Sequence, residues 1–243
     1  MTYKTKGIVL KSIKYGETSL VVTIFTEIFG IQTYMINGVR TSKKSSSKAN
    51  HFQPTAILDL VVYHNENKPI QRIKEFSWSV LYYNLLNDVI KNSIASFMAE
   101  LIQKCLKQPE PNSNLFNFCE DSFLQLDKSD KIVAANFTLF FTLHLTYFFG
   151  FRMIDNFNTD NLILDLQEGH FINRQPTHSN FIEGKNAELT AQLLKVMQPH
   201  ELEEFKLNRE IRRYLLMRYL EYYALHMTDF GQMKTLIVLH EVL

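Results

Sequence analysis

Cysteine is scarce in this chain of 243 residues, which contains only Cys105 and Cys119. Two thiols cannot build a disulfide framework or a zinc site of four thiolates. Because disulfides mark oxidising compartments, we expect a reduced, cytoplasmic protein. With eight glycines and six prolines, the chain is too poor in both for a collagen-like or disordered class. No succession of basic, apolar and small residues opens the sequence, so no secretory signal peptide is expected.

Signatures of enzymatic chemistry are also missing from the sequence. There is no phosphate-binding glycine loop, no nucleophile elbow and no His-Glu-x-x-His pair. We therefore predict no catalytic residues and no enzymatic activity. One alternative is a metal-dependent enzyme built on residues 155–178, where His170 and His178 accompany three aspartates. Because their spacing matches no ligand signature, we predict no metal site and no cofactor.

One hydrophobic run, Ile132–Phe151, carries no charge and is long enough to cross a bilayer. Thr138, Thr142 and Thr146 recur every four residues within it, which makes a polar stripe on one helical face. Such a stripe is typical of the central helix of a globular bundle. We therefore predict a buried helix with His144 in the core and no membrane association, with a single membrane span as the alternative.

Charge is unevenly distributed along the chain, although its formal net value is only +1. Residues 1–50 carry eight basic and two acidic side chains, whereas residues 77–243 carry 15 basic and 20 acidic ones. A basic amino-terminal part on an otherwise acidic chain indicates a polyanionic partner for that part. The alternative interpretation is a solvated basic surface that keeps a small domain soluble.

The amino-terminal third has the pattern of short strands joined by turns. Runs rich in β-branched residues alternate with Gly-containing turns, and no helix of crossover length separates them. Five strands in about 75 residues are typical of the oligonucleotide/oligosaccharide-binding (OB) fold, an antiparallel barrel. The predicted strands cover residues 6–14, 20–27, 31–39, 54–63 and 70–76.

From Ser77 onward the hydrophobic period becomes helical. We therefore predict an α+β protein with an OB-fold nucleic-acid-binding domain at 1–76 and a helical domain at 77–243. Residues 150–184 read as an irregular stretch with a small hairpin within 162–172. The predicted helices cover residues 80–92, 93–107, 112–126, 130–149, 187–197, 199–207, 209–227 and 233–242.

A basic, Ser-rich loop follows the third predicted strand and is the clearest candidate site. OB barrels bind single-stranded nucleic acid through a positive groove with aromatic rings for base stacking. The predicted nucleic-acid-binding residues are Lys11 and Lys14 on the first strand and Arg40, Lys43, Lys44 and Lys48 in the loop. Candidate stacking rings are Tyr3, Tyr15, Tyr34, Phe52 and Tyr63, although a small barrel also needs such rings in its core.

A second basic cluster lies near the end of the chain. At helical spacing, Lys206, Arg209 and Arg213 share one face, which predicts a second contact for DNA or for an acidic peptide. A solvated helix face is the alternative. Arg218 falls within the apolar arc of the same helix, so we expect it to be paired or to lie near a helix end.

Both ends of the sequence resemble a known family. The segment GIVLKSIKYGETSLVVTIFTEIFGIQTYMINGVR (Gly7–Arg40), with the basic loop and FQPTAILDL (Phe52–Leu60) after it, resembles the amino-terminal domain of the RecO family of bacterial recombination-repair mediators. The tail YLEYYALHMTDFGQMKTLIVLHEVL (Tyr219–Leu243) is similar to the carboxy-terminal helices of that family. Many relatives carry a zinc module with Cys-x-x-Cys pairs, but no cysteine follows Cys119 here, so we expect that module to be absent.

The resemblance implies an OB barrel joined to a helical domain, and a function without bond-making chemistry. Proteins of this kind bind single- and double-stranded DNA, anneal complementary strands and help to load RecA onto DNA coated with single-strand binding protein. The implied partners are DNA, RecR and single-strand binding protein, with RecA as an indirect partner, in the bacterial cytoplasm and at the nucleoid. The residues alone leave a second interpretation open, a structural interaction module that binds an acidic partner peptide through its basic barrel.

Overall fold

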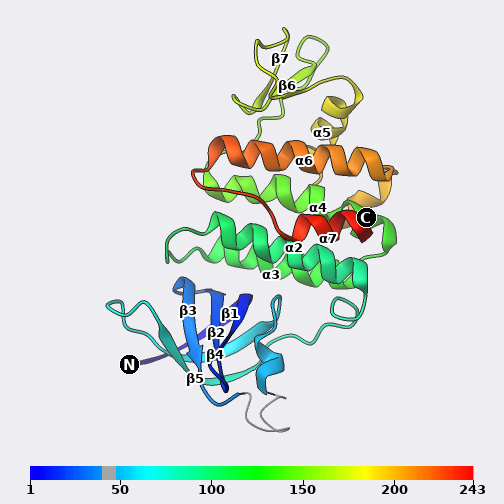
Figure 1. The fold of residues 1–243 in the computed structure, drawn as a ribbon. Coiled ribbons are helices and arrows are strands. Elements are labelled where there is room, and N and C mark those ends of the chain that lie inside the picture. The colour runs from blue at the N-terminus through cyan, green and yellow to red at the C-terminus, as the bar shows by residue number, and fades with distance from the viewer. Residues whose placement is uncertain (40–47, 243) are drawn as a thin grey trace. The chain divides into compact units, whose positions relative to one another are not determined.

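The computed structural model describes residues 1–39 and 48–242, and these form two compact units that are described separately. Unit 1 comprises Met1–Asn87 and Ala99–Asp127, and unit 2 comprises Asp88–Met98 and Lys128–Leu243. Strands make up much of unit 1, and helices dominate unit 2 (Figure 1). The predicted α+β class is confirmed.

Five strands in unit 1 form a closed barrel in the order β1-β2-β3-β5-β4 (Figure 1). Four of its pairings are antiparallel, and one pairing, between β3 and β5, is parallel. This five-stranded barrel confirms the predicted OB fold and adds one parallel pair to the predicted antiparallel arrangement. The strands are β1 (Thr2–Tyr15), β2 (Ser19–Thr26), β3 (Gly30–Ile36), β4 (Ile57–Tyr63) and β5 (Gln71–Trp78).

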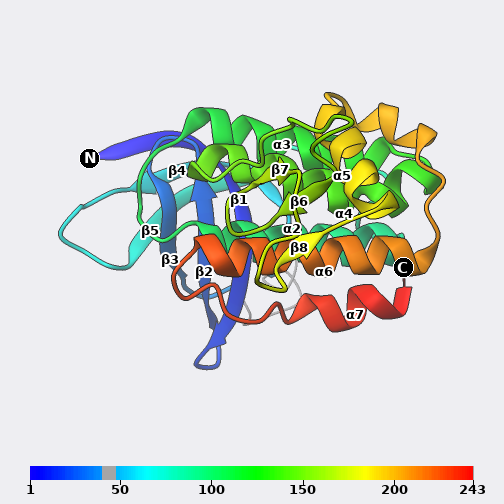
Figure 2. The same cartoon turned by 90° about the horizontal axis from the view of Figure 1, so that it is seen from above.

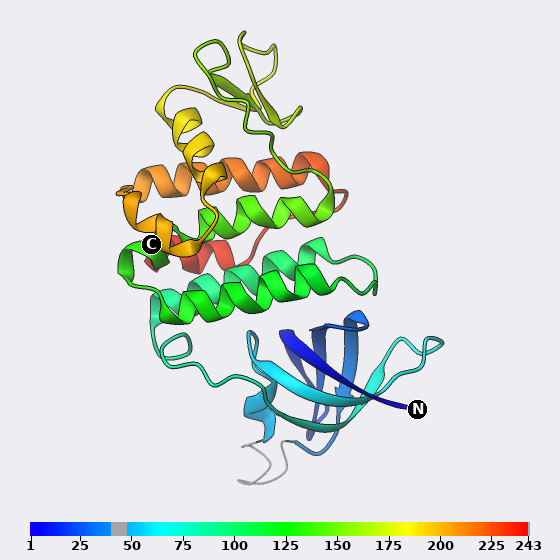
Figure 3. The same ribbon diagram turned by 180° about the vertical axis from the view of Figure 1, so that it is seen from behind.

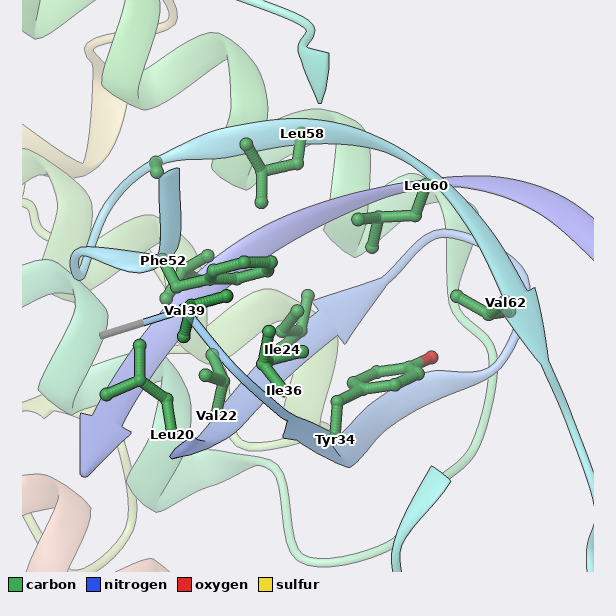
Figure 4. Packing of buried hydrophobic residues seen from close by; sticks show 12 residues of the cluster. Leu20, Val22, Ile24, Tyr34, Ile36, Val39, Phe52, Leu58, Leu60 and Val62 are labelled. Carbon is green, nitrogen blue, oxygen red and sulfur yellow. The ribbon is translucent and has the colours of Figure 1, made fainter. Parts of the chain in front are cut away.

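Alternate side chains of these strands fill the barrel interior, as the period of two requires. Figure 4 shows this core, to which β2 contributes Leu20, Val22 and Ile24. A short 3-10 helix, η1 (Asn50–Phe52), adds the fully buried ring of Phe52. Burying such a ring stabilises the folded state by about 2 kcal/mol or more.

The predicted start of the fourth strand at Pro54 is wrong, because β4 begins at Ile57. Pro54 and Thr55 instead form a turn that follows η1, and Thr55 in this turn adopts φ = 75°. That backbone is held in place because the Thr55 amide donates to the Val9 carbonyl at 2.7 Å. Turn conformations of this kind depend on distant partners, which the local sequence does not reveal.

The predicted helix over 80–92 is also wrong, since α2 spans Val89–Cys105 without a break. Upstream of it, within unit 1, the Asp127 carboxylate accepts hydrogen bonds from the amides of Tyr83, Asn84 and Leu85 at 2.7–3.0 Å. These bonds hold the segment in a non-helical conformation. Asp88 then begins α2, because its carboxylate accepts from the first helical amides, as expected of an N-cap residue.

Helix α3 (Ser113–Lys128) packs on the outer side of the barrel within unit 1. The rings of Phe25 and Phe116 lie 5.5 Å apart, and Lys6 forms an ion pair with Glu120 at 2.9 Å. The helix starts as predicted, because the Asn112 side chain accepts from an amide of the first turn. The two units are thus interleaved along the chain, and a domain boundary at residue 76 stays a prediction.

Helix α4 (Lys131–Leu145), continued by η2 (Thr146–Phe149), forms the centre of unit 2. Residues 131–149 are long and apolar enough to span a membrane by length and composition, yet 67% of this window is buried. The predicted core helix is therefore confirmed. Its stripe of threonines bonds within the helix, as when Thr142 Oγ1 donates to the Thr138 carbonyl at 2.6 Å. Its neighbours in contact are α5 (Lys185–Lys195), η3 (Pro199–Glu204) and α6 (Arg209–His226).

The stretch 150–184 contains a small sheet, drawn in yellow-green in Figure 3, and its strands pair in the order β7-β6-β8. Its strands are β6 (Ile163–Asp165), β7 (His170–Ile172) and β8 (Phe181–Ile182). The predicted hairpin is confirmed, and the third strand was not predicted because it is only two residues long. The last helix, α7 (Thr235–Val242), lies alongside α6 (Figure 2).

Candidate nucleic-acid interface

The two predicted lysines of β1 lie on opposite faces of the β1–β2 hairpin. A β-bulge between Val9 and Lys11 shifts the register of the strand. Beyond it, Lys11 pairs with Thr23 on the outer face, whereas Lys14 pairs with the buried Leu20 on the face that continues the barrel interior. Both lysines are exposed. The sequence alone could not separate them, because the bulge changes the alternation.

Lys14 and Lys48 are both exposed and adjoin segments that contribute to the same buried core. Leu20, the partner of Lys14, pairs in turn with Ile36 near the end of β3. The exposed Lys48 shortly precedes η1, whose Phe52 belongs to the same core as Leu20 (Figure 4). The other predicted loop cations fall outside the described residues. They are Arg40, Lys43 and Lys44.

The five candidate stacking rings divide into two groups. Tyr34 and Phe52 are fully buried in the barrel core, so neither is available to a base. Burial also raises the pKa of Tyr34 above its usual range. Tyr3, Tyr15 and Tyr63 are exposed, with fractions of 36%, 60% and 46%. The sequence could not sort them, since an aromatic ring suits either side of a strand.

A cleft of about 1060 Å³ lies within unit 1, and it was not predicted. It is lined by β2, β3, the β4–β5 loop, the end of α2 and the segment before α3. At its wall the rings of Phe29 and His64 stack with their centroids 3.8 Å apart. Lys68 and Lys107 are its basic lining residues. The cleft joins residues more than 80 positions apart, so no local pattern could have indicated it.

The second basic cluster is arranged differently from the prediction. Lys206 precedes α6 and so is not part of the predicted helix face. Arg209 and Arg213 both donate to the carbonyl of His240 in α7. Cations stabilise the carboxyl end of a helix, where carbonyls lack partners and the dipole is negative. These two arginines therefore have a structural role at α7, and a DNA contact of Lys206, Arg209 and Arg213 stays a prediction.

Burial and the adjacent Arg213 and Arg209 also lower the pKa of His240 below its usual value. The expected pairing of Arg218 is confirmed. Its guanidinium contacts Glu221 and donates to the carbonyls of Ser179 and Phe181. Arg218 thereby links α6 to the stretch 150–184.

The residues considered for a metal have structural partners. His178 Nε2 lies 3.3 Å from Asp165 Oδ2, and the other oxygen of that carboxylate accepts from the Gln167 amide at 2.8 Å. Within residues 1–39 and 48–242, no group of three or more His, Cys, Asp or Glu side chains has the arrangement of a metal site. Burial raises the pKa of both thiols, Cys105 and Cys119, so they resemble core residues rather than reactive ones.

Comparison with known families matches almost the whole chain. Residues 1–82 match the family model described as Recombination protein O N terminal, and residues 86–234 match Recombination protein O C terminal. The chain belongs to the RecO family. Its relatives include the DNA repair protein RecO of Azobacteroides pseudotrichonymphae, which is 35% identical over 242 residues. The match covers 100% of this chain and 99% of the relative.

Two further relatives carry the same name, DNA repair protein RecO. Those of Christiangramia forsetii and Bacteroides fragilis are 36% and 33% identical, and each match covers 100% of this chain and 99% of the relative. Membership in RecO makes this chain a DNA repair protein, consistent with a role in recombination. The two family models meet between residues 82 and 86, after the last barrel strand.

Proposed function

We propose that this RecO-family protein binds single- and double-stranded DNA and anneals complementary strands without catalysing a bond-making reaction. We further propose that it works with RecR and single-strand binding protein to help load RecA onto coated DNA. The observation that carries the proposal is an OB barrel with exposed Lys11, Lys14 and Lys48, in a chain that belongs to a DNA repair family.

Annealing requires that two polyanionic strands approach each other closely. Cations that neutralise phosphates reduce the repulsion and release counterions. Lys11 and Lys14 project from opposite faces of one hairpin, so they offer positive charge on both of its sides. Phosphate contacts carry no sequence information, which suits a protein that must anneal any pair of complementary strands.

An annealing assay on strands coated with single-strand binding protein tests this proposal. The full-length protein should accelerate annealing of coated complementary oligonucleotides, and RecR should modulate that rate. We define the barrel triple variant as Lys11→Ala, Lys14→Ala and Lys48→Ala, and expect it to anneal more slowly than wild type.

A matched control removes three exposed lysines from unit 2, Lys131, Lys185 and Lys195, and keeps the same total charge as the barrel triple variant. This control should anneal at the wild-type rate. A wild-type protein that anneals bare strands but never coated ones would contradict the mediator role. Equal losses in both variants would show that net charge, rather than the barrel, is responsible.

A further inference from the structure

The chain leaves β3 through an asparagine followed by a glycine, Asn37 and Gly38, and this dipeptide occurs nowhere else in the sequence. Asparagine is a thermolabile residue, because its side-chain amide can lose ammonia. The loss is fastest before glycine, where no Cβ hinders the approach of the next backbone nitrogen to the side-chain carbonyl carbon. Asn37 follows Ile36, the last residue of the β2–β3 ladder, so it lies outside the regular strand.

Both residues of the pair are accessible to solvent. Asn37 and Gly38 are exposed, so water and hydroxide can reach the side-chain amide and the backbone nitrogen. Gly38 adopts φ = 69°, in the left-handed region that glycine occupies without steric cost. A Cβ at this position would have no heavy atom of the described residues within 4 Å. Position 38 can therefore be substituted without a clash in the packing.

A neighbouring side chain acts on the amide that would react. The Ser19 hydroxyl donates a hydrogen bond to Asn37 Oδ1 at 3.2 Å. Ser19 begins β2 and pairs with Tyr15 across the β1–β2 turn, so a regular hairpin positions this donor. Attack on Asn37 Cγ places negative charge on Oδ1, and a donor at that oxygen stabilises the tetrahedral intermediate. Ser19 therefore has the position of an oxyanion donor.

We propose that Asn37 is a site of spontaneous deamidation. Hydroxide takes the proton of the Gly38 amide, and the nitrogen forms a bond to Asn37 Cγ while Ser19 stabilises the oxyanion. The bond from Cγ to Nδ2 then breaks, and Nδ2 takes a proton from water and leaves as ammonia. The product is a succinimide ring. Water opens this ring at either carbonyl and leaves aspartate or isoaspartate at position 37.

The reaction replaces a neutral amide with a carboxylate in the basic part of the chain. Asn37 shortly precedes Arg40 in the sequence. The neighbouring Ile36 pairs with Leu20, which in turn pairs with Lys14. A negative charge here opposes the attraction of a polyanion. The DNA affinity of the barrel therefore decreases as the protein ages; this consequence rests on the proposed DNA-binding function, whereas the deamidation itself does not.

Peptide mass spectrometry tests the site in the full-length protein. Wild type is incubated at mildly alkaline pH, and the fraction of each asparagine converted to an acid is followed over time. Asn37 should convert faster than the other asparagines, and its rate should rise with pH because a base removes the amide proton. Asn67 is the internal control, since it is exposed in a turn of the same unit but precedes Lys68. Conversion of Asn37 no faster than that of Asn67 would overturn the proposal.

Substitutions separate the two parts of the mechanism. Gly38→Ala should slow conversion about 10-fold or more, because its methyl group hinders ring closure and disfavours the left-handed backbone. Ser19→Ala should slow conversion about 3-fold or more, the effect of losing one modest hydrogen bond. Ser19→Thr keeps a hydroxyl and should convert as wild type. A wild-type rate in folded Ser19→Ala would overturn the oxyanion role, and a wild-type rate in Gly38→Ala would overturn the succinimide route.

Asn37→Asp tests the consequence for DNA. It should weaken oligothymidine binding and flatten the slope of log affinity against log salt by up to about 0.7, the value of one phosphate contact. The control Asn158→Asp adds the same charge to unit 2, keeps an acceptor for the Asp160 and Asn161 amides, and should bind as wild type. Wild-type binding by Asn37→Asp would overturn the consequence. A wild-type protein that bound no oligothymidine would refute the proposed function, while the measured masses alone would still decide the deamidation site.

Discussion

At the scale of single residues, His144 shows how unit 2 holds a titratable group in its neutral form. Its ring packs against Phe140 at 4.3 Å between centroids and hydrogen-bonds to the Val196 backbone. Burial lowers the pKa of His144 to about 4 from 6.5, and it outweighs the opposing effects of that bond and of Glu201. Protonation of His144 is therefore disfavoured in the folded state.

This shift predicts a loss of stability in acid. Above pH 6.5 the imidazole is neutral in both states and has no effect on the pH dependence of folding. As the pH falls from 6.5 to 4, the unfolded chain binds a proton that the folded protein does not, so the free energy of unfolding decreases. The expected decrease is about 2–3 kcal/mol between pH 7 and pH 4.5.

Urea unfolding of wild type and His144→Gln at several pH values measures this contribution. The glutamine retains a donor for the Val196 backbone but does not titrate. The free energies of unfolding of the two proteins should converge as the pH falls. Only wild type is destabilised by protonation of residue 144 in the unfolded chain. Parallel curves over this range would show that His144 is not responsible for any acid sensitivity.

At the scale of elements, three side chains of α6, spaced four residues apart, form hydrogen bonds to the stretch 150–184. Arg218 donates to the Phe181 carbonyl at 2.8 Å, Tyr222 to the Phe151 carbonyl at 2.6 Å, and His226 Nε2 lies 3.0 Å from the Leu166 carbonyl. This spacing places them on one face of the helix. Hydrogen bonds from a helix thus help to order this stretch.

Tyr222→Phe tests the importance of one of these bonds. Burial raises the pKa of Tyr222 to about 12, so its hydroxyl stays protonated and remains a donor at neutral pH. Its loss leaves the Phe151 carbonyl without this donor and should cost about 1 kcal/mol. Amide hydrogen exchange should become faster in β6 and β7. The control, Tyr214→Phe, alters an exposed tyrosine of the same helix and should change neither quantity; equal behaviour of the two variants would contradict the role of the bond.

The barrel was predictable because each strand carries its own pattern of alternating and β-branched residues. Helix α3 was predictable because its start also has a local signal, the capping residue Asn112. The helix predicted over residues 80–92 was wrong because the conformation of this segment depends on Asp127, which lies 42 residues beyond Leu85. The bulge at Val9 likewise determines which way Lys11 and Lys14 point. The sequence indicated both lysines as candidate DNA contacts, but it could not indicate that they lie on opposite faces of the hairpin.

At the scale of the whole molecule, charge is segregated along the chain. The first 50 residues carry eight basic and two acidic side chains, whereas residues 77–243 carry more acidic than basic ones. Such segregation steers a polyanion toward one region and away from the rest. In this protein the basic residues of that region belong to the barrel strands and to positions 40–48, so the charge pattern and the OB fold favour the same part of the chain for the proposed DNA binding.

The salt dependence of single-strand binding tests this central claim most directly. The logarithm of oligothymidine affinity is measured against the logarithm of salt concentration for wild type, the barrel triple variant and its unit 2 control. Each phosphate contact on single-stranded DNA contributes about −0.7 to the slope. We predict a steep negative slope for wild type and the control, and a slope flatter by about 2 for the barrel triple variant. An unchanged slope in a folded barrel triple variant would contradict the account and place the DNA contact elsewhere in the chain.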